Sequence, residues 1–176
     1  MKGLLIMLVA LACVMSAGFS LTTVLWPDQD GLYSQWTSVG ECSGFSCVNS
    51  ENVVDYVAAS TPGLVSSYTF NDINPGLGVA QINNVRVYYR AKRMTPTAPC
   101  MTPFLRLTGS EYYSPVVCPS TISWGLVPVI YRVNPQTGML WTIQDVNNLE
   151  AGMGSVMGTG GSVGVAAVYA VVTYSV

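Results

Sequence analysis

The sequence contains no histidine, and charged residues make up only 9% of its 176 residues. Histidine is the commonest general base and metal ligand, so its absence excludes Ser-His-Asp and Cys-His catalysis and histidine-based zinc sites. Seven basic and nine acidic side chains give a formal charge of −2. Proteins that bind nucleic acids usually carry a strong positive charge, so this class of protein is excluded. We therefore expect no nucleic-acid partner, no metal, no cofactor and no enzymatic activity.

Helical periodicity is also nearly absent, and short alternating segments separated by Pro, Gly, Asn and Ser predict a β-sandwich. The clearest strand is Gln81 to Lys92, in which Val85, Val87 and Tyr89 alternate with polar residues. Further strands are expected at Tyr33 to Val39, Val53 to Ala58, Leu64 to Phe70, Thr102 to Thr108, Tyr112 to Cys118, Ile122 to Val133 and Val163 to Ser175. The length suits one domain, so the fold prediction is all-β: a two-sheet antiparallel, jelly-roll-like β-sandwich over residues 27–176.

One short helix is expected after Trp141. Thr142 is placed to cap it with Asp145 three residues later, and Ile143, Val146 and Leu149 fall on one face. Gly152 stands where such a helix would stop. Gly152-Met153-Gly154 with Gly158 lacks the spacing of a phosphate-binding loop and is interpreted as a flexible connection.

The amino terminus predicts an export segment. Leu4 to Trp26 is a run of 23 residues without a charge, preceded by Lys2 and followed by Asp28 and Asp30. A run of this length can span a membrane, and lysine before it places the rest of the chain outside. The most apolar part ends at Val14 and small residues follow, which favours a signal peptide over residues 1–20, cleaved near Gly18 to Ser20.

Three other interpretations of this segment remain open. An uncleaved membrane anchor would use the whole run to Trp26 and keep the β domain outside the cell or on its surface. Lys2-Gly3 also resembles the start of a type IV pilin signal, although Leu8 stands where bacterial pilins usually carry glutamate. In a lipoprotein, Cys13 would be acylated.

Four cysteines remain in the exported part, where an oxidising environment favours disulfides. Proximity in sequence suggests Cys42 with Cys47 and Cys100 with Cys118, among three pairings that four cysteines allow. Zinc would need closer Cys-x-x-Cys pairs.

A basic and aromatic cluster on the strand Gln81 to Lys92 is the only candidate ligand or assembly surface. It consists of Arg86, Tyr88, Arg90 and Lys92, on the face that the alternation directs to solvent. These side chains could contact a glycan or a phosphate, or lie solvated. Trp36, Tyr112, Tyr113 and Trp141 are further aromatic residues that could stack on sugars or lie in the core.

The acidic residues give no comparable pattern. Asp28, Asp30 and Gly31 match only the start of a calcium loop, so a solvated turn is the preferred interpretation. No spacing among the other carboxylates selects a pair for glycoside hydrolysis.

Several short motifs, in order, resemble a known group of proteins. They are Pro27 to Gly31, Gln35-Trp36-Thr37, Asp55-Tyr56-Val57, Tyr68-Thr69-Phe70, the strand Ile82 to Arg93, Tyr112, Asn134 to Gly138, Trp141-Thr142 and Asn148 to Gly152. The chain from Leu25 to Val176 thereby resembles jelly-roll-like β-sandwich structural proteins of phage virions and environmental genomes, of the tail, decoration or fibre type. The resemblance implies a structural role and transfers no functional residue. An export segment and cysteines distinguish this chain from that group.

Together these observations predict a non-enzymatic, exported structural protein, a subunit of a virion, filament or cell-surface assembly. It would self-associate or bind other surface proteins, using β-prone ends at Leu21 to Leu25 and in the carboxy-terminal strand to complete a neighbour's sheet. A carbohydrate-binding or adhesion module is the alternative, and a pilin-like subunit with a retained amino-terminal helix is a second.

Overall fold

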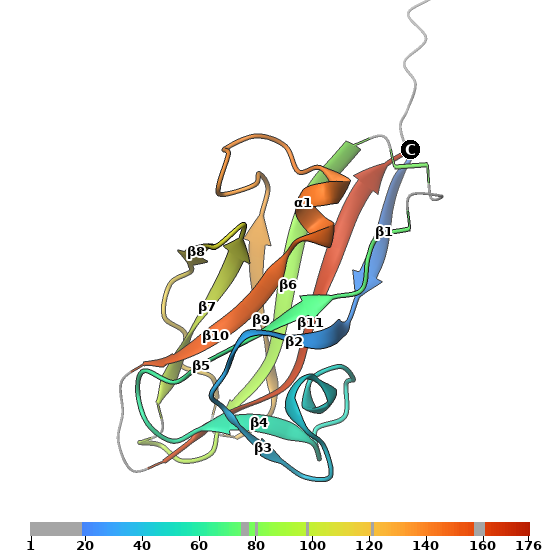
Figure 1. The fold of residues 1–176 in the computed structure, drawn as a ribbon. Coiled ribbons are helices and arrows are strands. Elements are labelled where there is room, and N and C mark those ends of the chain that lie inside the picture. The colour runs from blue at the N-terminus through green and yellow to red at the C-terminus, as the bar shows by residue number, and fades with distance from the viewer. Residues whose placement is uncertain (1–18, 75–77, 80, 98, 121, 157–160) are drawn as a thin grey trace, which may run out of the picture.

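A computed structural model describes residues 19–74, 78–79, 81–97, 99–120, 122–156 and 161–176. These residues form two antiparallel β-sheets packed face to face, with one short α-helix and one 3-10 turn (Figure 1). The all-β sandwich prediction is therefore confirmed, and the described part contains eleven strands. The signal-peptide, pilin and lipoprotein interpretations concern residues 1–18, which lie outside the described residues.

The first sheet, called sheet A, has the order β3-β4-β11-β6-β9, and β1 also pairs with β11. Its strands are β1 (Ser20–Leu25), β3 (Thr37–Val39), β4 (Tyr56–Ala59), β6 (Gln81–Arg93), β9 (Gly125–Tyr131) and β11 (Val163–Ser175). The second, called sheet B, has the order β2-β5-β10-β7-β8. Its strands are β2 (Pro27–Ser34), β5 (Val65–Phe70), β7 (Cys100–Leu107), β8 (Ser110–Tyr113) and β10 (Glu150–Val156).

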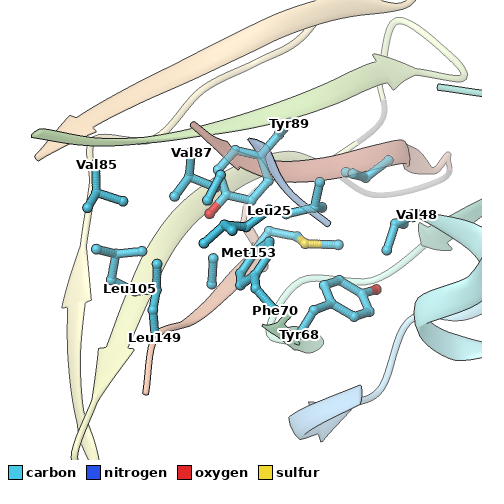
Figure 2. Close-up of a cluster of buried hydrophobic side chains, with 14 of the residues drawn as sticks. Leu25, Val48, Tyr68, Phe70, Val85, Val87, Tyr89, Leu105, Leu149 and Met153 are labelled. Atoms are coloured by element: carbon cyan, nitrogen blue, oxygen red, sulfur yellow. The ribbon is translucent and has the colours of Figure 1, made fainter. Parts of the chain in front are cut away.

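The core lies between the two sheets (Figure 2). From sheet A, alternate residues of β6 such as Val85, Val87 and Tyr89 point into it and are fully buried. From sheet B, Leu105 and Met153 meet them. Period-two alternation, which a strand needs when only one of its faces is buried, thus holds along β6 as predicted.

The two β-prone ends of the chain pair with each other. β1 runs antiparallel to the last part of β11, from Ser20 opposite Ser175 to Leu25 opposite Ala170. The carboxy-terminal strand β11 therefore has partners along both sides, whereas β1 is paired on one side only within the described residues. That an end of the chain completes a neighbour's sheet stays a prediction, and β1 is the end that could do so. The sandwich also begins at Ser20 rather than at residue 27, because a strand of the sheet directly follows the apolar run.

Strand β10 is a second correction, because its residues were expected to end a helix and form a flexible connection. Instead it lies at the centre of sheet B, between β5 and β7. Gly152 and Gly154 occupy its outward positions, and Ala151 and Met153 point into the core. At Gly152, an added Cβ would lie 2.3 Å from Cζ of Phe104 and 2.6 Å from the carbonyl oxygen of Ser66. Glycine is required here because the Phe104 ring packs directly over the strand.

The predicted helix and both predicted disulfides are present in the structure. In α1 (Ile143–Asn147), Thr142 and Asp145 form the capping box. Cys42 is bonded to Cys47 around the 3-10 turn η1 (Gly44–Cys47), and Cys100 is bonded to Cys118. No helix within the described residues has both the length and the apolar character needed to cross a membrane.

Candidate binding face

The four residues selected from the sequence lie together on the outer surface of sheet A. Arg86, Tyr88, Arg90 and Lys92 alternate with fully buried residues of β6 and are half-buried themselves. Nη1 of Arg86 donates to Oη of Tyr88 at 3.1 Å, and Nη1 of Arg90 donates to the carbonyl oxygen of Glu51 at 2.9 Å. The strand therefore presents a guanidinium on each side of a tyrosine.

Aromatic rings from other segments extend this row across the sheet. Tyr169 of β11 lies opposite Tyr88, and the two rings stack with centroids 5.0 Å apart and planes at 16°. Trp26, which directly follows β1, packs on Tyr169 with centroids 5.0 Å apart. Three segments distant in sequence thus form one aromatic row.

A second aromatic pair lies further along the same outer surface. Gly164 of β11 sits between the buried residues Val163 and Val165 and faces outward. An added Cβ would lie 2.6 Å from Cε of Met94 and 3.1 Å from both Trp124 and Tyr56, whose ring centroids are 5.3 Å apart. The absence of a side chain at Gly164 makes room for this pair and for Met94. We call Trp26, Tyr56, Tyr88, Trp124 and Tyr169 the aromatic face.

The other aromatic residues suggested by the sequence do not contribute to this face. Trp36 and Trp141 are 5% and 3% exposed and belong to the core, and Tyr112 packs partly buried against it. Tyr113 is 55% exposed but lies on sheet B. Sequence reasoning missed four of the five rings because cross-strand register, which places them together, cannot be deduced from one strand's alternation.

Burial also raises the pKa of one hydroxyl on the aromatic face. The pKa of Tyr169 is raised, chiefly by burial, with further contributions from the Glu51 carboxylate and Tyr88, while Arg90 opposes the shift. Tyr169 therefore stays protonated at neutral pH and keeps its hydroxyl as a hydrogen-bond donor.

A separate polar cluster occupies the outer surface of sheet B. Nη1 of Arg106 contacts Oε2 of the buried Glu150 at 2.8 Å, and the amide of Leu32 donates to Oε1 at 2.7 Å. Ser67 also donates to that carboxylate oxygen. These bonds fasten the bulged strand β2 onto the sheet, so this charge pair has a structural role.

Glu111 forms the other half of this cluster. It accepts hydrogen bonds from the hydroxyls of Tyr33 and Tyr113, the latter at 2.6 Å. These bonds, with Tyr113 first, lower the pKa of Glu111, and Arg106 adds to the effect. Conversely, the bond to Glu111 raises the pKa of Tyr113 to about 12. Both carboxylate oxygens of Glu111 thus accept a hydrogen bond from a tyrosine of sheet B, which again indicates a structural role.

A cavity and a pair of acidic residues are the remaining candidate sites among the described residues. A shallow cavity of about 400 Å³ lies beside α1, lined by residues that include Ile82, Trp141 and Gln144, with no charged group. Asp28 and Asp30 lie in strand β2, not in the solvated turn expected from the sequence. Nowhere in the described ranges do three or more His, Cys, Asp or Glu residues gather as metal ligands.

Comparison with known proteins gives a structural likeness only. No family model and no curated protein matches the chain. Among solved structures, the chain is similar to the CBM22-1 xylan-binding domain from Paenibacillus barcinonensis Xyn10C, with a TM-score of 0.45 and 11% identity. The match covers 91% of this chain and 98% of that domain.

Proposed function

We propose that this protein is a non-catalytic, exported binding domain that holds an extended glycan along the aromatic face. One observation carries the proposal: five aromatic side chains from five separate segments converge on the outer surface of one sheet. Aromatic rings at a surface offer apolar area to sugar rings, and neighbouring polar groups fix their orientation.

The dimensions of the face favour an elongated ligand. Along β6, Tyr88 in the aromatic row and Lys92, opposite Gly164 under the second pair, are four residues apart. At a rise of about 3.3 Å per residue, the two aromatic groups are separated by roughly 13 Å. A single sugar cannot contact both groups, whereas a chain of several sugars can.

The two tryptophans are the best sugar-stacking groups on the face. Tyr88 and Tyr169 use ring surface on one another, so they contribute mainly edges and hydroxyls. Trp26 and Trp124 are half-buried and each packs against one aromatic ring within the described residues. Each tryptophan therefore keeps indole surface for a ligand.

Affinity electrophoresis against a panel of soluble polysaccharides tests the proposal. Trp124→Ala should reduce the affinity for the retarding polysaccharide on the order of tenfold, the loss expected for one buried aromatic contact. Tyr113→Ala, which removes an exposed ring from the opposite sheet, is the matched control and should bind normally. Unfolding midpoints verify that both variants remain folded. Retardation by no member of the panel, or equal loss in both variants, contradicts the proposal.

Self-association through the same face is the second candidate, and it corresponds to a structural or assembly role. The face also exposes aliphatic side chains: Val24 is 46%, Leu126 49% and Ile130 51% exposed. Tyr, Trp and Arg beside such residues are typical of protein interfaces. Sedimentation equilibrium of the wild type and of Ile130→Glu distinguishes the two functions. A dimer that the substitution dissociates supports assembly, and a monomer at high concentration excludes it.

A further inference from the structure

We infer that the ligand of the aromatic face is an acidic polysaccharide, one that carries carboxylate or sulfate groups. This inference rests on the proposed function, and it adds the chemical class of the glycan. It derives from the distribution of charge over the molecule, which is independent of the aromatic rings.

Basic residues are concentrated on this face although the domain as a whole is acidic. The described residues contain nine acidic and six basic side chains, since Lys2 of the seven lies outside them. Three of the six, Arg86, Arg90 and Lys92, point outward from β6 on the same surface as the aromatic groups. Of the others, Arg106 pairs with Glu150 on sheet B and Arg93 donates to backbone carbonyls at Pro96 and Pro119. Arg132 directly follows β9 and is exposed.

No carboxylate neutralises the three outward cations. Within the described residues, Arg106 and Glu150 form the only ion pair, and they lie on the opposite sheet. Glu51 binds the guanidinium of Arg90 through its backbone carbonyl, and no ion pair joins the Glu51 carboxylate to Arg90. That carboxylate contributes to the raised pKa of Tyr169. The cations therefore retain their charge for a ligand.

The two arginines keep most of their hydrogen-bonding capacity. A guanidinium has five N–H donors, and Arg86 and Arg90 each use Nη1 for one hydrogen bond to a described residue. These bonds hold the two guanidinium groups on the outer surface of β6, at positions four residues apart on one strand. That separation is about 13 Å. Arginine binds planar carboxylates through two parallel hydrogen bonds, so two charged groups at a similar spacing along an extended polysaccharide suit this pair.

Matched pairs of polymers test the inference. The probes are polygalacturonate with its carboxyl-reduced form, and dextran sulfate with dextran. Binding to polygalacturonate identifies carboxylate as the recognised group, and binding to dextran sulfate identifies sulfate. In each pair the charged polymer should retard the protein at least tenfold more strongly than its neutral counterpart, and the retardation should weaken as salt is added.

Two variants, each of which lowers the net charge by one, complete the test. Arg90→Gln should weaken binding to the acidic polymer roughly tenfold, because it removes a charge-assisted hydrogen bond. Gln144→Glu on α1 changes the net charge by the same amount away from the face, and it should leave binding unchanged. Equal retention of charged and neutral polymers overturns the acidic class while the proposed function stands. Equal weakening by both substitutions overturns it as well, since binding would then follow net charge alone. Retention of no polymer at all contradicts the proposed function itself.

Discussion

At the scale of single residues, two glycines of β10 differ in what lies next to them. The Cβ of an alanine at 152 would overlap the buried ring of Phe104 and the backbone oxygen of Ser66, and neither can withdraw. An alanine at 154 would meet only Cγ2 of Thr102, at an ordinary 3.4 Å. Neither glycine has a positive φ, so backbone conformation does not distinguish the two positions.

We expect Gly152→Ala to lower the free energy of unfolding by about 2 kcal/mol, the usual cost of overpacking. The melting temperature should fall by about 4–8 °C. Gly154→Ala, the matched control, should be neutral or stabilise by about 0.5 kcal/mol, because it reduces the entropy of the unfolded chain. Thermal and urea unfolding of both variants measure the difference. Similar midpoints for the two would show that Phe104 does not pack over the strand as described.

Another residue-scale prediction concerns the Glu111–Tyr113 hydrogen bond. The raised pKa of Tyr113 means that this bond contributes stability below pH 10, and the contribution is lost as pH rises through about 12. For Glu111 the pKa is lowered, so its contribution is present above the ordinary value of 4.5 and is lost as pH falls through the folded-state pKa.

Glu111→Gln removes the negative charge that holds the proton on Tyr113. The Tyr113 pKa should therefore fall from about 12 toward the ordinary value of 10. Carbon NMR of ring-labelled tyrosine, titrated between pH 8 and 13, measures this pKa, and Tyr113→Phe assigns the resonance. A Tyr113 pKa that stays near 12 in the variant would mean that burial, not the carboxylate, causes the shift.

At the scale of secondary-structure elements, the sequence predicts a strand well where apolar and polar residues alternate. β6 has this pattern, so its core side and its outward residues Arg86, Tyr88, Arg90 and Lys92 could be predicted directly. β10 has no such pattern, since glycine fills its outward positions at 152 and 154, and a packed ring covers the first of them. The sequence of β10 therefore shows no alternation of apolar and polar residues. For this reason the most buried strand of sheet B was interpreted as a connection.

The aromatic face was predictable only in part for a related reason. One strand determines which of its own residues point outward, but not which residues of other strands lie beside them. The positions of Trp26 and Tyr169 next to Tyr88 depend on the β11–β6 register and on where β1 ends. Both are determined by packing over the whole domain.

Strand β1 provides an element-scale test of this pairing. A chain that begins at Trp26 lacks β1, and with it the buried side chain of Leu25 and the partner of residues Ala170 to Ser175. We expect a loss of about 3 kcal/mol in unfolding free energy and concentration-dependent association through the exposed edge of β11. A chain that begins at Leu21 loses only the Ser20–Ser175 pair and serves as the control. Equal stability and equal monomer content in the two chains would contradict the β1–β11 pairing.

At the scale of the whole molecule, the fold restricts how the amino-terminal segment can be used. The uncharged run extends from Leu4 to Trp26, but its last part from Ser20 onward forms β1 and the start of the binding face. The uncharged stretch that precedes β1 in the sequence, Leu4 to Phe19, has 16 residues. A membrane-spanning helix needs about 20 residues, so we predict that this stretch is a signal peptide and not an anchor.

We therefore predict that the native protein is a secreted chain beginning between Phe19 and Leu21. Cleavage there leaves β1 able to pair with β11, whereas cleavage beyond Leu25 would remove that strand. Intact-mass spectrometry of the native protein, before and after reduction, measures both the first residue and the number of disulfides. The unreduced mass should be four hydrogens lower, two for each disulfide.

A full-length mass would instead mean that the apolar segment is retained, and a start at Leu4 would favour pilin-like processing. In either case the aromatic face would be held close to a membrane or a filament, and access of long polysaccharides would then depend on that geometry.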